Sequence, residues 1–596
     1  MTAVEIEPAP APAPAPEAAP RPRRRPIRRR RLGVTGVVLM VVLCYLVVGP
    51  ILMLLLASFE NTDKGIVIRP PFPWTLDNFV TMLTDGQTWT VLLTTLVFSL
   101  ACLVIAFLVA LAIAWLVERT DMPLRGLTYV LTVAPTGIPT MILALSWVLL
   151  ANPSNGTFNV ILRQLLGLGS DTGPFDVYSL GGMIFVQATA LVPLTFLLVS
   201  ASLRAINPNL EDSARASGAS GFRVLSRVTI PLLTPVLVGA LIYQFVNVIE
   251  TTDIPLFLGL PAKIYVFSSE VYRITHPAFG LPDFGLASAY GILLLALAVL
   301  PLLVYNRVIR HSQDYATVSG KTFRPRRTKL GAWRWPAFAL VMVYAVVTFV
   351  IPMLVLLYAS FQPYLGQIDL ESFGRMTLDG WSSVLASPGF WGSLGNTLLL
   401  GVVSSVVVMG LSVGLSWIMV RVKGRAGSLA NFLSFMPHAM PGVVIALAVL
   451  LLYLVFRIGI YGTIWIVIIA MITQYLSLGT RMTTGGIVQI QVGLEEAGRT
   501  SGAAGRTIWW RVLLPLLRPV LLNGVLLVFL YAMKNLTLPL MLQSSTNTVL
   551  ATEIWHSWTD GRVTEAAVVS VILTVITVVA SILLRIFGTD AEERAR

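Results

Sequence analysis

The feature that most constrains this chain is a series of apolar segments, each long enough to cross a membrane. About 20 apolar residues in a helix span the ~30 Å of hydrocarbon in a bilayer. Several segments contain proline, which a membrane helix tolerates when neighbouring groups satisfy the freed backbone. The pattern predicts an all-α membrane protein of about 12 transmembrane helices. The expected spans are 33–58, 90–116, 127–151, 181–202, 232–257, 285–306, 335–360, 392–420, 428–455, 462–481, 516–541 and 565–587.

Composition supports a membrane setting. Hydrophobic residues make up 56% of the 596 residues and charged residues only 12%, whereas soluble proteins carry roughly 25% charged residues. The mean hydropathy is +0.80. These values exclude a soluble enzyme and predict that the lipid bilayer covers much of the surface.

The net charge of +13 could indicate a nucleic-acid partner, but its distribution favours another interpretation. If the N-terminus is cytoplasmic and the spans alternate in direction, most Lys and Arg residues fall in cytoplasmic segments, as the positive-inside rule requires. We therefore expect a multi-pass protein with both termini in the cytoplasm. The positive excess then reflects topology and contact with anionic lipid, and we expect no nucleic-acid binding.

Cysteine and histidine residues do not indicate a metal centre. Cys44 and Cys102 both lie inside apolar segments and suggest neither a disulfide framework nor a metal cluster. His438, next to Pro437, is interpreted as a packing or gating residue, and the other three histidines lack metal-ligand spacing. We therefore assign no metal site.

The chain contains an internal repeat. Pro50–Phe59 (PILMLLLASF) recurs 302 residues later as Pro352–Phe361 (PMLVLLYASF), and Leu210–Leu237 aligns without gaps to Leu494–Leu521 with fifteen of 28 positions identical. Each half has six expected spans, so both halves face the same way, as a parallel repeat does. The predicted organisation is a disordered Pro/Ala/Arg-rich cytoplasmic tail (1–32), a first repeat (33–310), a basic cytoplasmic linker (311–334), a second repeat (335–588) and a cytoplasmic C-terminal tail (589–596).

The most conspicuous repeated segment is a polar loop expected to lie in the cytoplasm, which a simple pore has no reason to duplicate. Its second copy reads Glu496-Ala497-Gly498, then Gly502, then Val512-Leu513-Leu514-Pro515. The first copy reads Asp212-Ser213-Ala214, then Gly218, then Val228-Thr229-Ile230-Pro231. Both copies resemble the "EAA" loop of ABC importer permeases, with Asp212 in place of Glu and Ser213 and Gly498 in place of Ala.

This resemblance implies the type I ABC importer permease fold in a bacterial cytoplasmic membrane. In that family the loop forms a short helix, a glycine break and a second short helix, and it docks on an ATP-binding subunit. Glycine permits the sharp turn, and proline begins the next membrane helix where its missing N–H costs nothing. The residues expected to couple to the ATPase are Glu211, Asp212, Ala214, Gly218, Pro231, Glu495, Glu496, Ala497, Gly502 and Pro515.

The same resemblance implies the partners: two ATP-binding subunits and an extracytoplasmic substrate-binding protein. This chain contains no phosphate loop of its own, since Tyr315–Thr322 lacks the first glycine and a preceding strand. We therefore expect a transport subunit without enzymatic activity or a bound cofactor, with ATP and Mg²⁺ held by the partner subunits.

The segments 249–272 and 534–555 resemble fused ferric-iron-type permeases, which implies ferric iron as cargo. The same subfamily also serves thiamine, polyamine and phosphonate importers, so a small organic ion is the alternative. A secondary transporter is a further alternative, but it leaves the duplicated loop unexplained.

Three ionisable residues inside the expected spans are candidates for the translocation path or gate: Glu250, Asp253 and Lys534. Glu250 and Lys534 occupy equivalent positions in the two halves, so they could pair across the path. Alternatively, both could extend to the outer surface. Fe³⁺ prefers oxygen ligands such as carboxylate and phenolate, so Tyr243 could serve as a ligand together with Glu250 and Asp253. We expect no complete ligand set, because three residues within eleven positions of one helix should not face one point.

Overall fold

The computed structural model describes residues 33–60, 74–167, 171–205, 208–312, 327–364, 370–422, 424–456 and 458–593. Within these ranges the chain is almost entirely helical, and its β-structure consists of two isolated bridges, Glu60–Trp74 and Thr120–Thr328. The expected tail 1–32, most of the linker and the last three residues lie outside the described residues.

Nine helical segments of the described chain are long and apolar enough to cross a membrane, and the number rises to 12 if three bent pairs each form one span. The prediction of about 12 spans therefore agrees with the upper count. The nine segments are α1 (Val34–Ser58), α3 (Gly86–Arg119), α7 (Leu180–Ala205), α12 (Phe284–Ser312), the run Gly331–Ala359 that includes α13 (Arg334–Ala345) and α14 (Ile351–Ala359), α17 (Pro388–Arg421), α20 (Ile464–Gln489), the run Gly505–Lys534 that ends in α23 (Leu514–Lys534), and α26 (Val563–Glu593).

The expected continuous spans at 127–151 and 428–455 are both broken. In the first half, α4 (Arg125–Val133) and α5 (Thr140–Ala151) meet at a bend of 101°. In the second half, α18 (Arg425–Phe435) and α19 (Gly442–Phe456) meet at 109°. A short 3₁₀ turn and two prolines occupy each break. Proline removes a backbone donor and disfavours helix in the residue before it, so the helix cannot continue through these positions.

The expected spans at 232–257 and 516–541 also end earlier than predicted. Helix α10 (Ile230–Glu250) stops at Glu250, and α23 stops at Lys534. In the second half, the next turn is a separate short helix, α24 (Thr537–Met541). Both charged residues therefore lie at the last position of a membrane helix.

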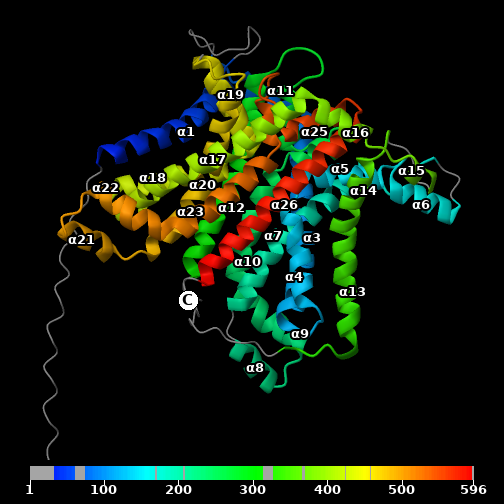
Figure 1. Ribbon diagram of the computed structural model, residues 1–596, viewed down its shortest axis with the longest axis horizontal. Coiled ribbons are helices and arrows are strands. Elements are labelled where there is room, and N and C mark those ends of the chain that lie inside the picture. Colours follow the sequence, from blue (N-terminus) through cyan, green and yellow to red (C-terminus); the bar gives the residue numbers. More distant parts are fainter. Residues whose placement is uncertain are drawn as a thin grey trace, which may run out of the picture.

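The two halves use the same order of elements and interlock. Helix α1 packs on α19 of the other half, and α14 (Ile351–Ala359) packs reciprocally on α5. One hydrophobic core runs through both halves. Near the top of Figure 1 lie α16 (Asp379–Ala386) and the short helices α11 (Phe267–Thr275) and α25 (Leu550–Thr559). At the bottom lie α8 (Pro208–Ala216) and α9 (Gly221–Val224).

The end of the segment between the halves is attached to the first half. Thr328 donates its N–H to the carbonyl of Arg119 (2.9 Å), and the N–H of Leu330 bonds to the Asp121 side chain (2.8 Å). The Arg215 side chain in α8 donates to the Thr328 hydroxyl (3.0 Å). The chain that leads into the second half is therefore held against the first.

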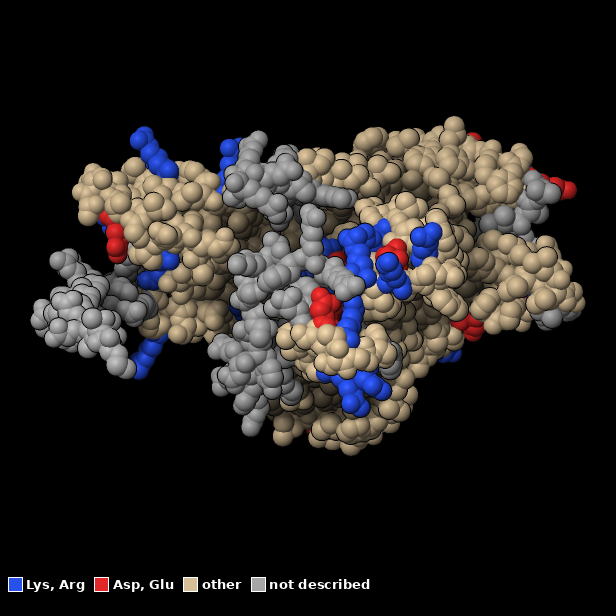
Figure 2. Space-filling model, turned by 90° about the horizontal axis from the view of Figure 1, so that it is seen from below, with Lys and Arg blue, Asp and Glu red and all other residues tan. Residues whose placement is uncertain are grey.

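Basic side chains collect on the side that carries α8 and α9. Figure 2 looks at this side and shows groups of Lys and Arg with few Asp and Glu between them. Arg223, Arg227, Arg327 and Lys329 are exposed. Because basic residues concentrate on the cytoplasmic side of membrane proteins, this is the side expected to face the cytoplasm.

We predict that this orientation can be read from cysteine labelling. In a chain carrying Cys44→Ser and Cys102→Ala, Arg506→Cys should react with a membrane-impermeant maleimide only in inside-out vesicles. Phe279→Cys, at a position that is 94% exposed and lies between α11 and α12, should react only in right-side-out vesicles. The reverse pattern would contradict the assignment.

Candidate coupling loops and translocation cavity

The duplicated polar loop has the same order of backbone elements in both halves. In the first half α8 is followed by α9, and in the second α21 (Val492–Thr500) is followed by α22 (Gly505–Ile508). The glycine between the helices has a positive φ in each copy, +84° at Gly218 and +79° at Gly502. Such a backbone is open to glycine and strained for other residues. The predicted helix, glycine break and second helix are therefore present in both copies.

The prolines of the loop stand where the membrane helices begin. Pro231 and Pro515 are the second residues of α10 and α23, and each helix follows directly on a π-helical turn, Leu225–Thr229 or Trp509–Leu513. A π turn shifts the hydrogen-bonding register by one residue, which accommodates the missing proline N–H. In the second half the loop thus runs without interruption into the membrane helix, whereas in the first half the helix bends by 58° between Ser226–Thr234 and Leu237–Glu250.

The acidic residues of the loop divide into an outward and an inward set. Glu496 and Ala497 are exposed, and Asp212 and Ala214 are partly so. Glu211 and Glu495 are only 4% and 1% exposed. Both carboxylates therefore point into the protein, and the coupling role expected of Glu211 and Glu495 stays a prediction that would act through contacts within this chain.

The inward carboxylates meet arginines that sequence reasoning missed. Glu211 pairs with Arg119 (Nε–Oε1 3.2 Å) and Glu495 with Arg421 (2.8 Å). Arg119 and Arg421 are themselves related by the 302-residue offset of the repeat. The two arginines lie at equivalent positions at the ends of long apolar segments, and this equivalence could have identified them from the sequence.

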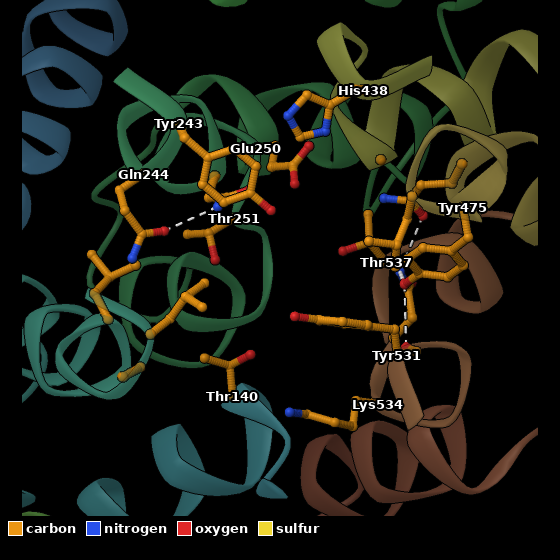
Figure 3. A pocket seen from close by; sticks show the side chains of 18 of the residues that line it. Thr140, Tyr243, Gln244, Glu250, Thr251, His438, Tyr475, Tyr531, Lys534 and Thr537 are labelled. Atoms are coloured by element: carbon orange, nitrogen blue, oxygen red, sulfur yellow. Dashed lines mark hydrogen bonds between the residues drawn. The ribbon is translucent and has the colours of Figure 1, made fainter. Parts of the chain in front are cut away.

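A cavity of about 1040 Å³ lies between the two halves and contains the three ionisable candidates. Glu250 and Asp253 come from the first half and Lys534 from the second. Figure 3 shows Tyr243 and Glu250 on one side facing Tyr475, Tyr531 and Lys534 on the other. The candidates therefore line an internal space shared by both halves, and the alternative in which Glu250 and Lys534 extend to the outer surface does not hold.

The direct pairing of Glu250 with Lys534 is not observed. No ion pair within 4.0 Å joins them among the described side chains. Lys534 donates through Nζ to the carbonyl of Thr136 in the break between α4 and α5, and its ammonium lies 5.9 Å from the Tyr531 ring centroid. The carboxylate that interacts electrostatically with Lys534 is that of Asp253.

Tyr243, Glu250 and Asp253 do line one space, contrary to the expectation from a single helix. The helix ends at Glu250, so the chain turns before Asp253 and its side chain faces the same cavity. Tyr243 stacks on His438 across the halves, with ring centroids 5.2 Å apart. Within the described part of the chain, no group of three or more His, Cys, Asp or Glu side chains could hold a metal ion.

Comparison with known proteins accounts for this arrangement. The family model described as "Binding-protein-dependent transport system inner membrane component" matches residues 106–313 and 406–593. It matches once in each half, and together the two matches cover more than half of the chain. The chain belongs to this family. Both coupling loops lie inside the matched regions, so the protein is a fused, two-lobed permease. The family also removes the secondary-transporter alternative.

The relatives that match this permease are named for different transported substances. It is 26% identical over 405 residues to a "Ferric transport system permease protein" of Actinobacillus pleuropneumoniae, covering 67% of this chain and 57% of the relative. It is 29% identical over 262 residues to a "Trehalose/maltose transport system permease protein" of Thermococcus litoralis, covering 43% and 85%. A solved bacterial importer of the polysaccharide alginate aligns with 21% identity over 48% of this chain and 96% of its own, at a TM-score of 0.38.

We predict that Gly502→Ala weakens binding of the ATP-binding subunit while Gly505→Ala does not. The left-handed backbone at Gly502 costs a residue with a side chain about 1 kcal/mol. If the free Ala variant relaxes out of this turn, docking must restore it, which lowers the affinity by about fivefold. Gly505 lacks a positive φ and an added Cβ there meets nothing within 4 Å, so it is the matched control. Titration of the labelled ATP-binding subunit onto the permease in nanodiscs measures both. Equal affinities for the two variants would show that the turn is not needed for docking.

Proposed function

We propose that this permease is the membrane subunit of an ATP-driven importer in a bacterial cytoplasmic membrane, with both termini in the cytoplasm. An extracytoplasmic binding protein delivers the cargo, and two ATP-binding subunits dock on the loops at Gly218 and Gly502. The observation that carries this proposal is the duplicated loop, which continues into membrane helices ending at a shared cavity. ATP and Mg²⁺ belong to the partner subunits, and this chain needs no cofactor.

The mechanism follows from the continuity of loop and helix. Helix α10 begins after the first loop and ends at Glu250, and α23 begins after the second and ends at Lys534. Movement of the ATP-binding subunits at the loops is therefore delivered to the cavity through two helices of 21 residues each, of which α10 is bent by 58° near its start, between Thr234 and Leu237. Closing the two loops toward each other changes the access of the cavity from one side of the membrane to the other.

We propose ferric iron as the cargo. The match to the ferric permease is longer than either half of this chain, so it runs across both. The cavity offers the oxygen atoms that hard cations prefer, from Glu250, Asp253 and the phenol of Tyr243. Transport requires sites weak enough to release the ion, and scattered oxygen donors suit transit better than a tight ligand cage.

A small organic ion, such as thiamine, a polyamine or a phosphonate, is the second candidate. The cavity of about 1040 Å³ reaches the upper end of the usual range for small-molecule sites. Its lining combines two carboxylates with Lys534 and several aromatic rings. This mixture of charges and stacking surfaces favours a larger solute.

We predict that the loaded binding protein stimulates ATP hydrolysis by the complete complex. The permease and its ATP-binding subunits are reconstituted in lipid, and the cognate binding protein is added with Fe³⁺, with an organic ion or empty. Stimulation by the iron-loaded form supports ferric transport, and stimulation by the organic-ion form alone replaces iron with that solute. Failure of the permease to bind any ATP-binding subunit would refute the importer.

We further predict that Glu250→Gln and Lys534→Met each reduce transport at least tenfold, because each removes a charge that lines the cavity. Glu371→Gln, an exposed carboxylate in the short helix α15 (Leu370–Gly374) and outside the cavity lining, is the control and should leave transport unchanged. Uptake of labelled cargo into proteoliposomes gives the measurement. Unchanged uptake in both cavity variants would remove these residues from the path.

A further inference from the structure

Beneath each coupling loop lies the same buried ion pair. The Arg119 and Glu211 side chains are 3% and 5% exposed, and those of Arg421 and Glu495 are 7% and 1% exposed. The pairs Arg119–Glu211 and Arg421–Glu495 are named the Arg–Glu clamps. The arginines repeat at an offset of 302 residues and the glutamates at 284, so both members are retained although the spacing between them has changed.

Each arginine connects the end of its own helix, the end of a second membrane helix and the start of the coupling helix that carries the paired glutamate. Arg119 is the last residue of α3 and also donates to the carbonyl of Leu203 near the end of α7 (2.8 Å). Arg421 is the last residue of α17 and donates to the carbonyl of Ile490 at the end of α20 (2.7 Å). The final carbonyls of a helix lack intrahelical donors, and a cation there interacts favourably with the helix dipole.

Each glutamate lies in the first turn of the coupling helix, α8 or α21, where a negative charge is favoured. It also reaches toward the far end of the loop. Glu211 accepts a hydrogen bond from Thr229 in the π turn before α10 (3.1 Å). Glu495 accepts one from Trp417 (3.4 Å), whose ring lies 5.9 Å from that of Trp509 in the π turn before α23.

The burial of the pairs makes the attachment rigid. Separating a buried ion pair leaves a charge without a partner in a medium that solvates it poorly. The coupling helix therefore resists rotation or displacement relative to α3 and α7, or to α17 and α20. The exposed Glu496 and the partly exposed Asp212 remain available to a docked partner.

We infer that the Arg–Glu clamps are the positioning elements that transmit movement of the coupling helices to α3 and α17, in addition to the covalent path into α10 and α23. This inference rests on the proposed function. Because the clamp acts through the loop, its glutamates are not contact residues for the ATP-binding subunit.

The experiment uses Glu211→Gln, Glu495→Gln and their combination in the complete transporter reconstituted in lipid. Glutamine keeps the shape and removes the charge. In the combined variant we expect the ATP-binding subunits to copurify and basal ATP hydrolysis to persist, while stimulation by the loaded binding protein falls at least tenfold. A spin label at the exposed Arg499→Cys, in the chain freed of Cys44 and Cys102, should become more mobile in Glu495→Gln.

Glu118→Gln is the matched control. Glu118 pairs with Arg204 (2.6 Å) and joins α3 to α7 on the same side, without a contact to α8 in that pair. Stimulation in this variant should stay within twofold of the unaltered protein. An equal loss in Glu118→Gln would overturn the inference in favour of general weakening of the helix ends.

Full stimulation together with an unchanged label in the combined variant would also overturn it. The proposed function fails separately, if the unaltered complex responds to no loaded binding protein. In that case the mobility of the α21 label still tests whether the clamp holds the loop.

Discussion

The lack of water in the bilayer core is the constraint on which this structure depends. Each backbone N–H and C=O in that region needs a partner within the protein, so the chain forms helices and can interrupt them only where other helices surround the break. The sharp bends between α4 and α5 and between α18 and α19 meet this condition. Thr136 in the first break receives the Lys534 ammonium, and His438 in the second stacks on Tyr243.

The breaks and the helix ends together create the cavity. A straight membrane helix would fill the space between the lobes, whereas the bent pairs and the termini at Glu250 and Lys534 leave polar groups around an open centre. The frame is symmetric but its chemistry is not, because equivalent positions carry a carboxylate in one lobe and an ammonium in the other. A cargo passing this point therefore meets a carboxylate on one side of the cavity and an ammonium on the other.

The two lobes act as one unit because they interlock. Helices α1 and α14 each pack against the bent helix of the opposite half. The segment Arg327–Leu330 adds hydrogen bonds to the junction of α3 and α4 in the first lobe. Movement at one coupling loop is therefore carried into a core that both lobes share.

The sequence by itself determined the helical class, the approximate spans, the parallel repeat and the glycine break of the loop. Each depends on local chemistry: apolar length, side-chain size and the conformational freedom of Gly218 and Gly502. Only the tertiary structure decided that Glu211 and Glu495 face inward, that the expected spans at 127–151 and 428–455 are bent, and that Tyr243 and Asp253 share one cavity with Glu250. These features depend on contacts between residues far apart in the chain. Arg119 meets Glu211 across 92 positions, and Lys534 meets Thr136 across 398, distances over which no local pattern specifies a partner.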